Sequence, residues 1–183
     1  MKIYKYIADS DEFNSFITVK EHREIYSSIG KGSSLVHSWK PMPVKNFFKD
    51  KEGVFMNRIG DFPSLVIGDP VFSEKAWGVF KPYIGKYTEP LPLITTEGKY
   101  YALNILNIID ALDKENSEIS YRSSGRISRV FKHVFYVEKV KDQFIFKVPE
   151  TKGLEVYISE DFKRIAEENG LKGLDFSKVV FEY

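Results

Sequence analysis

Residues 100–113 read YYALNILNIIDALD, an apolar run that asparagines interrupt and that closes on two carboxylates, Asp110 and Asp113. If Ile105 to Leu112 were helical, the two acids would lie three residues apart on one face of the helix. There they could share a cation or a proton, and the run would be a catalytic helix. The structure of this stretch therefore decides between two kinds of protein.

The surroundings of the run favour a strand. Thr96-Glu97-Gly98 is a short loop with a glycine, and it separates the run from another apolar segment at 91–95, which is typical of a hairpin. Aromatic and β-branched residues also suit a strand. We therefore predict a central strand over 100–109, buried on both faces. Asp110 and Asp113 become turn or capping acids that accept hydrogen bonds from nearby backbone N–H groups.

The rest of the chain alternates between strand and helix patterns. Period-two alternation or short apolar runs predict further strands or extended pieces. They cover residues 3–8, 35–39, 54–57, 65–67, 71–72, 130–140, 144–148, 155–158 and 179–181. A second hairpin is predicted to turn at Lys141-Asp142, between the strands at 130–140 and 144–148.

Three helices are predicted from capping residues and apolar stripes, at 19–29, 73–81 and 159–169. Ser73 and Ser159 suit the N-cap position. Pro82 is expected to end its helix because its ring disfavours the α conformation in the preceding residue, and Gly170 followed by leucine indicates a Schellman ending.

These elements predict the α+β class: a mainly antiparallel sheet of consecutive hairpins with a few packed helices. At 183 residues, we expect one domain over 1–183, with a less regular part at 1–60 and a sheet-rich core at 61–183. PVFSEKAW at 70–77 and EVYISEDF at 155–162 resemble one another as strands that run into a serine-capped helix. The pair is either an internal repeat or a common way to begin a helix.

The composition argues against several classes of protein. The sequence has no cysteine, hence no disulfide framework and no thiolate nucleophile. A net charge of +1 gives no general attraction to nucleic acid or anionic membranes. No segment has the roughly 20 apolar residues of a membrane span, and the N-terminus lacks a signal peptide. A cytoplasmic protein without a membrane partner is expected.

No group of residues has the spacing of a catalytic or metal site. His22, His37 and His133 fall in three separate segments, without the spacing of metal ligands. Gly-x-Ser-x-Gly does not occur. We expect no catalytic residues, no metal and no cofactor.

Charge is uneven along the chain. Residues 61–120 hold 5 basic and 9 acidic residues, whereas 121–147 hold 7 basic and 2 acidic residues. The basic segment, with Arg122 and Arg126 near its start, is either a hairpin that contacts an anionic partner or a solvated strand face. Trp39 lies where helix and strand signals are weak, and it is either pinned to the core or an interface anchor.

Several short motifs occur in a fixed order along the chain. They are Ser38-Trp39-Lys40-Pro41, Asp61-Phe62-Pro63, Val71-Phe72-Ser73-Glu74, Leu91-Pro92-Leu93, the run at 100–113 with Ser117 after it, Ser123-Ser124-Gly125-Arg126-Ile127, Ile145-Phe146-Lys147-Val148-Pro149 and Gly170-Leu171-Lys172-Gly173-Leu174-Asp175-Phe176. Together they resemble family eleven of the bacterial immunity proteins of polymorphic toxin systems, formerly a domain of unknown function. The N-terminal third matches poorly outside the tryptophan motif, and Glu89-Pro90-Leu91-Pro92-Leu93 carries an additional proline.

The resemblance implies a cytoplasmic protein that binds and neutralises a cognate toxin. It brings no catalytic motif and no defined set of contact residues. From the residues, our candidates for toxin contact are Trp39, Asp110, Asp113, Arg122 and Arg126. Two alternatives stay open: a nucleic-acid-binding module that uses 122–147, or a metal-dependent hydrolase that uses Asp110 and Asp113. Nucleic acid is the less expected partner, and the sequence leaves the oligomeric state open.

Overall fold

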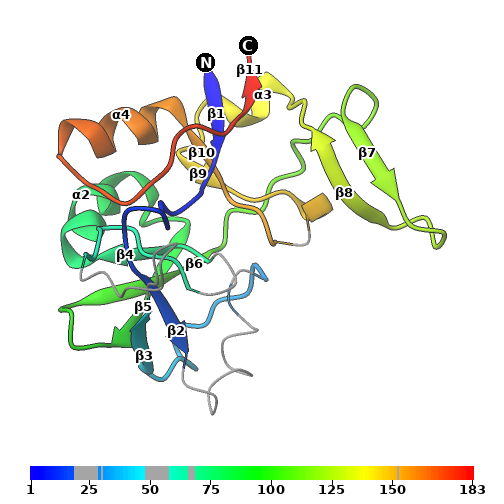
Figure 1. Ribbon diagram of the computed structural model, residues 1–183. Coiled ribbons are helices and arrows are strands. Elements are labelled where there is room, and N and C mark those ends of the chain that lie inside the picture. Colours follow the sequence, from blue (N-terminus) through cyan, green and yellow to red (C-terminus); the bar gives the residue numbers. More distant parts are fainter. Residues whose placement is uncertain (19–28, 30, 48–57, 66–68, 152) are drawn as a thin grey trace.

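The structure is a computed structural model of residues 1–183, which describes the chain except for residues 19–28, 30, 48–57, 66–68 and 152. It confirms the α+β class, with strands that are mostly antiparallel and helices packed against them (Figure 1). The described strands form three sheets rather than one. The extended piece predicted at 54–57 and, except for Ile29, the helix predicted at 19–29 lie outside the described residues.

The first sheet is antiparallel and joins the two ends of the chain. Its order is β11 (Val179–Glu182), β1 (Lys2–Lys5), β10 (Tyr157–Ser159) and β9 (Ile145–Phe146). Strands were predicted at or beside all four places. The partner of β9 is β10, however, and not the segment at 130–140.

The second sheet has five strands. Its order is β2 (Ser15–Thr18), β3 (Met42–Phe47), β5 (Thr88–Ile94), β6 (Tyr100–Ile105) and β4 (Val71–Ser73). The predicted hairpin is confirmed as β5 and β6, which pair antiparallel from Thr88 opposite Ile105 to Pro92 opposite Tyr101. Among the described strands of this sheet, β3 and β5 pair parallel, and the other pairs are antiparallel.

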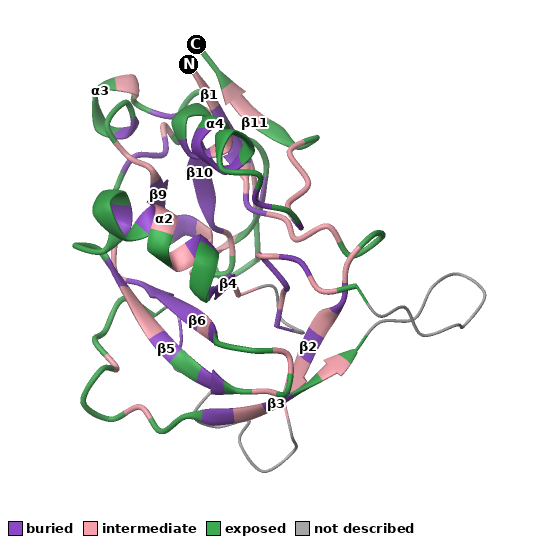
Figure 2. Ribbon diagram, turned by 90° about the vertical axis from the view of Figure 1, so that its left-hand side faces the viewer, coloured by how far each residue is buried: buried purple, intermediate pink, exposed green. Residues whose placement is uncertain are grey.

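Strand β6 is the central strand that the opening stretch predicts. It lies between β5 and β4, and residues 102–105 are buried in succession, so both faces are covered. Figure 2 shows this burial along β6. The strand ends at Ile105 rather than Ile109, because the chain then leaves the sheet and pairs Ile108 with Lys147.

Two helices begin on the serines predicted to cap them. The Ser73 hydroxyl accepts from the backbone N–H of Ala76 at 3.0 Å and opens α2 (Glu74–Ile84). The Ser159 hydroxyl does the same for Phe162 at 3.2 Å and opens α4 (Glu160–Glu168). After α4, Gly170 has φ +60° and Leu171 N–H bonds to the Ala166 carbonyl, which is the predicted Schellman ending.

Helix α2 ends close to Pro82, as predicted, but three residues later than the expected bound of 81. Helix α2 continues to Ile84, because Pro82 lies in the last turn, where its missing N–H costs one bond. Ile84 is almost fully buried in the core, and Gly85 N–H still bonds to the Lys81 carbonyl. Core burial of Ile84 therefore outweighs the local preference of the residue before proline.

The two serine-capped helices occupy equivalent places in their sheets. Helix α2 connects β4 to β5, and β6 lies antiparallel between these two strands. Helix α4 connects β10 to β11, and β1 lies antiparallel between them in the same way. Each unit is a split β-α-β arrangement. The similarity between residues 70–77 and 155–162 therefore includes the strand topology around each helix as well as the serine cap.

The third sheet is a two-stranded hairpin of β7 (Glu118–Tyr121) and β8 (Ile127–Lys132). The prediction that 130–140 and 144–148 pair as a hairpin is therefore wrong, because β8 pairs with β7 instead. Residues after β8 form a short helix, α3 (Val137–Val140), whose buried Val140 enters the core. A 3-10 turn, η2 (Pro149–Thr151), leads from β9 toward β10.

A layer of stacked rings joins the two helices. Phe80 of α2 and Phe162 of α4 stack with centroids 4.0 Å apart, and Phe62 and Phe72 pack around them. No helix within the described ranges is long and apolar enough to span a membrane.

Candidate functional site

The β7–β8 hairpin, residues 118–132, extends from the body of the molecule and is here termed the arm (Figure 1). At its tip, Arg122 N–H donates to the Arg126 carbonyl at 2.8 Å, and Gly125 takes a φ of +73° that suits glycine. The side chains of both arginines are exposed. Two of the predicted toxin contacts are therefore neighbours at the tip of the arm.

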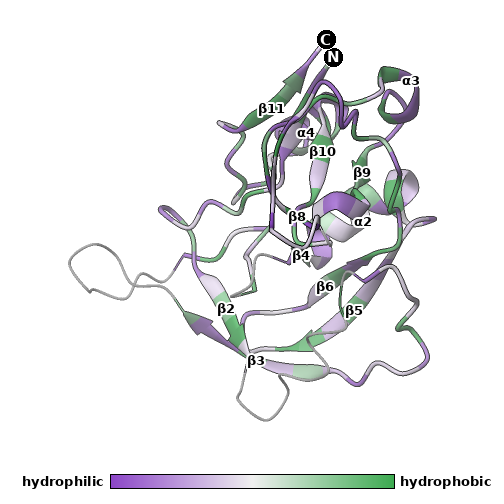
Figure 3. Cartoon of the chain, turned by 90° about the vertical axis from the view of Figure 1, so that its right-hand side faces the viewer, coloured by the Kyte–Doolittle hydropathy of each residue, from purple (hydrophilic) through white to green (hydrophobic). Residues whose placement is uncertain are grey.

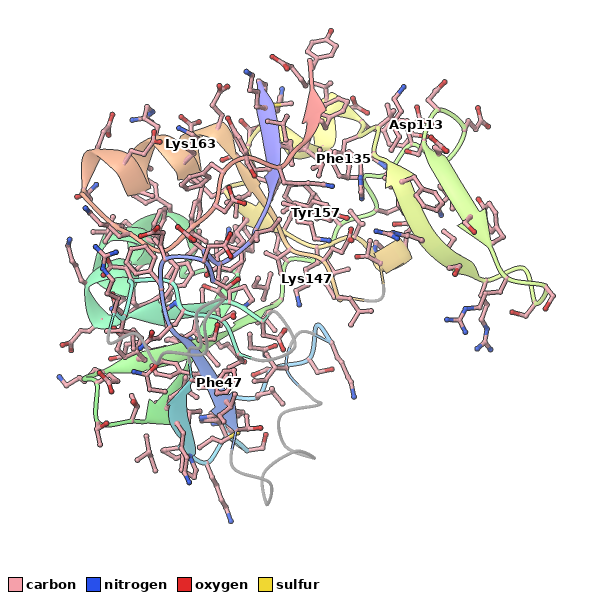
Figure 4. All side chains as sticks on the ribbon, in the orientation of Figure 1. Phe47, Asp113, Phe135, Lys147, Tyr157 and Lys163 are labelled. Atoms are coloured by element: carbon pink, nitrogen blue, oxygen red, sulfur yellow. The ribbon has the colours of Figure 1, made fainter. Side chains whose placement is uncertain are left out.

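One face of the arm anchors it to the body. Val130 is buried, and Ile119 opposite it packs against the same cluster, which includes Phe135 and Tyr157. Figure 4 shows Phe135 and Tyr157 close together at the base of the arm, with ring centroids 5.3 Å apart. Apolar contact thus fixes the position of β8 relative to the first sheet.

The rest of the arm offers an aromatic ring and cations to solvent. Phe131 is 58% exposed, and the Arg129 guanidinium lies 5.4 Å from the centre of its ring. Such a pair holds a positive charge in place beside an apolar surface. Large rings and arginines are the residues that dominate the energy of protein interfaces.

A cleft of about 400 Å³ separates the arm from the first sheet. Residues 129–133 form one wall, residues 178–180 at the start of β11 form the other, and Lys5 and Glu155 also line it. Strand β11 is apolar up to Glu182 (Figure 3). The cleft therefore combines an apolar edge with several charged side chains, and we refer to it as the β8–β11 cleft.

Glu155 in the cleft accepts hydrogen bonds from three sides. Lys5 Nζ lies 2.6 Å from Oε1, the Tyr157 hydroxyl donates to Oε2 at 2.7 Å, and His133 Nε2 lies 3.3 Å from Oε2. Tyr157 Oη also lies 2.9 Å from His133 Nε2. Because the hydroxyl hydrogen points to Glu155, Nε2 must carry a hydrogen for this contact to bond.

The network fixes the charge of its members. Burial favours the neutral form of Glu155, but hydrogen bonds from His133, Lys5 and Tyr157 outweigh burial and lower the pKa of Glu155 to about 2. Burial, and next the charge of Glu155, raise the pKa of Tyr157 far above its usual value. At neutral pH the network therefore holds an ionised carboxylate beside a neutral phenol.

Sequence reasoning missed this network. Glu155 and Tyr157 share one face because they lie two residues apart in extended chain, and this was a usable signal. No local pattern links His133 to Glu155 and Tyr157, because they lie 22 and 24 positions further along the chain. Of the other histidines, His37 is exposed in a turn and His22 lies outside the described residues.

Asp113 is a turn acid, as predicted. Its Oδ1 accepts from the backbone N–H groups of Glu115 and Asn116 at 3.1 Å each, and its Oδ2 accepts from the Asn116 side chain at 2.7 Å. These bonds to the ionised form lower the pKa of Asp113. Asp110 is exposed, and its backbone carbonyl accepts from Lys139 Nζ at 2.6 Å.

The two acids thus have different surroundings, and the carboxylate of Asp113 is already bound within its own turn. Among the described residues, no group of three or more histidine, aspartate or glutamate side chains could hold a metal ion.

Trp39 packs on the second sheet. Its indole N–H donates to the Pro92 carbonyl at 2.9 Å, and its ring lies against the cluster under β3 and β5. The extended piece predicted at 35–39 is a turn instead, closed by bonds from the N–H groups of Ser38 and Trp39 to the Leu35 carbonyl. The structure therefore gives this tryptophan an intramolecular partner at both its ring and its nitrogen.

The basic segment at 122–147 is not a continuous charged surface. Lys139 bonds to the Asp110 carbonyl, and its Nζ lies 4.9 Å from the centre of the Tyr136 ring. Lys147 is fully buried and donates to the Gly153 carbonyl at 2.7 Å (Figure 4). Burial lowers the pKa of Lys147, and Asp69 at 4.0 Å opposes this. Only the first half of the segment supplies the charge of the arm.

Residues 94–180 match the immunity protein family Imm11. This confirms the resemblance inferred from the sequence. The Imm11 match begins near the end of β5 and covers the arm, α4 and nearly all of the cleft lining. The motifs before residue 94, including that of Trp39, lie outside the matched segment. No curated protein matches the chain significantly.

Proposed function

We propose that this chain is the cytoplasmic immunity partner of a bacterial polymorphic toxin, which it binds and neutralises stoichiometrically. The observation that carries the proposal is the match of residues 94–180 to an immunity family, since members of such a family act in toxin immunity. The specific toxin, its neutralisation and the compartment are parts of the proposal.

The surface within the matched segment supports binding rather than catalysis. The arm is anchored by Val130 and presents Phe131, Arg129 and the arginine pair at its tip. An anchored element with exposed aromatic and guanidinium groups suits recognition of another protein. The carboxylate that lines the cleft, Glu155, is already held by three donors, so we propose a positioning role for it and no chemical step.

Arg122 and Arg126 are our proposed first contacts among the residues singled out from the sequence. Both are exposed and adjacent at the tip of the arm. Trp39 bonds to the Pro92 carbonyl of β5, and Asp113 bonds to the backbone of its own turn, and we propose that both act through stability. Asp110 is exposed beside Lys139 of α3, and we propose it as a peripheral contact.

The test is co-expression with the toxin whose gene is adjacent in the genome. Cells that express this toxin alone should stop growing, and cells that also express the chain should grow and yield a complex of the two proteins. An unrelated toxin from another system is the matched control. Equal binding to both toxins, or no rescue of growth by a folded chain, would contradict the proposal.

A further inference from the structure

We infer that the β8–β11 cleft receives an acidic, extended segment of the toxin. This inference rests on the proposed function and adds to it the chemistry of the partner and the place where it binds. Three observations carry it: the charge of the cleft, the free strand edge of β8 on one wall, and the apolar side chains at its rim.

The charge of the cleft is strongly one-sided. Lys5, Arg129, Lys132 and Lys178 line it, against the single carboxylate of Glu155. Lys5 is paired with that carboxylate at 2.6 Å. The ion pairs found in the described part of the chain leave the other three cations without a carboxylate. A partner with carboxylates would supply the missing charge.

One wall of the cleft is a strand edge. Five consecutive residues, 129–133, line this wall, so the cleft follows the edge of β8 rather than one face, whose residues would alternate. Among the described strands, β8 pairs only with β7. It therefore keeps an edge with unpaired N–H and C=O groups, which an extended peptide can pair with. The opposite wall belongs to the first sheet, since Lys5 and Glu155 line the cleft together with residues 178–180.

The free edge of β8 favours a polypeptide over a nucleic acid. A strand edge offers alternating donors and acceptors, and a peptide backbone offers the same two groups in return. A phosphodiester backbone presents acceptors, so it leaves the carbonyl groups of an edge unpaired. The net charge of the chain, +1, likewise lacks the excess of cations usual for nucleic-acid binding.

The rim of the cleft adds an apolar requirement. Phe131 and Val179, one on each wall, are 58% and 40% exposed. Arg129 and Phe131 lie on one face of β8. A bound segment that carries both acidic and apolar residues on one of its faces would place carboxylates near Arg129 and Lys178 and apolar side chains against Phe131 and Val179. The cleft thus selects for a composition as well as for a charge.

The test reverses one cation on each wall, in the variant Arg129→Glu/Lys178→Glu. Its matched control, Lys86→Glu/Lys172→Glu, changes the net charge equally at two exposed lysines that do not line the cleft. We expect the cleft variant to lose at least about 10-fold in affinity for the toxin in calorimetry, and the control to change less than about 2-fold. The single variant Lys178→Glu, outside β8, repeats the measurement if the double variant melts early.

A peptide probe separates this inference from the proposed function. The probe is a labelled peptide of ten residues in which pairs of glutamates alternate with pairs of valines, so that each face of the strand carries both types. It is compared with a peptide of the same pattern that has lysine in place of glutamate, and with a single-stranded oligonucleotide. We expect the acidic peptide alone to bind, more weakly in salt and not to the cleft variant. If the toxin binds both double variants as tightly as the wild type, the inference is wrong while the proposed function stands. Tighter binding of the oligonucleotide than of the acidic peptide would also overturn it.

Discussion

Phenylalanine has different roles in two regions of the molecule, the ring layer between α2 and α4 and the exposed arm. In the helix layer, Phe80 and Phe162 stack with centroids 4.0 Å apart and are fully buried. In the arm, Phe131 is 58% exposed and lies beside a guanidinium group rather than another ring. Burial of phenylalanine stabilises the fold, whereas exposure of phenylalanine beside a cation leaves binding energy for a partner.

The difference indicates that the fold is stabilised in one region of this molecule and that a partner is recognised in another. Serine caps, a Schellman ending and stacked rings secure the helix layer. The arm is a two-stranded hairpin, which is marginal on its own, and it depends on Val130 and Ile119 for its anchorage. Substitutions in the two regions should therefore have different consequences.

Phe162→Ala should have the largest effect on stability. The ring is fully buried among Phe62, Phe72 and Phe80, and its loss should lower the free energy of unfolding by about 3–5 kcal/mol. Urea denaturation followed by circular dichroism measures this loss. Phe131→Ala is the matched control in the arm, and it should cost under about 0.5 kcal/mol while weakening toxin binding. Equal losses of stability would remove the separation.

Glu155→Gln should come next, because it removes the charge that three donors share. Hydrogen bonds to an ionised group are each worth about 1.5–3 kcal/mol, and we expect a net loss near 2 kcal/mol at neutral pH. The variant should also change the pH dependence of stability. The pKa of Glu155 falls from 4.5 to about 2 in the folded chain, so its contribution is present above pH 4.5 and is lost as the pH falls through 2.

Denaturation curves from pH 7 to pH 2 measure this dependence. The wild type should lose stability relative to Glu155→Gln across the acidic range, until the two converge. A constant difference between the two curves down to pH 2 would show that the carboxylate is not the group that titrates.

A smaller effect is expected at the two acids of the opening stretch. Asp113→Ala removes three hydrogen bonds that hold the turn before β7, so the melting temperature should fall. Asp110→Ala is the matched control, because the bond from Lys139 goes to its backbone carbonyl, and it should leave the melting temperature unchanged. An Asp113→Ala variant that kept full stability yet lost neutralisation would place this acid in the interface instead.

Arg122→Ala/Arg126→Ala should have the smallest effect on stability, under about 0.5 kcal/mol, because both side chains are exposed at the tip. Their effect should instead appear in the rate of association with the toxin, which slows when steering charges are lost. Stopped-flow mixing at low and high salt measures it. An unchanged rate at low salt would remove these arginines from the proposed interface.

Patterns between residues that are close in sequence predicted several elements of the fold. The hairpin around Gly98, the caps at Ser73 and Ser159 and the ending at Gly170 depend on neighbours in sequence, and the structure confirms each of them. The predicted end of β6, Ile109, lies four residues beyond the observed end at Ile105. The chain leaves the sheet there because Ile108 pairs with Lys147, which is distant in sequence.

The candidate site depends on contacts that local rules do not encode. The segment at 130–140 reads as one strand, yet burial of Val140 and the competition of β10 for β9 divide it between β8 and α3. His133 meets Glu155 only through this arrangement. Charge counting found the basic segment, but it could not show that Lys147 is buried while Arg129 is exposed.

Amide hydrogen exchange with and without the adjacent-gene toxin tests the central claim most directly, because it reads the whole chain in one experiment. The toxin should slow exchange in residues 118–132 and 178–180, at the arm and the cleft, and leave α2 and α4 unchanged. Slower exchange confined to the exposed faces of α2 and α4, with none in the arm, would contradict the separation of recognition from stability.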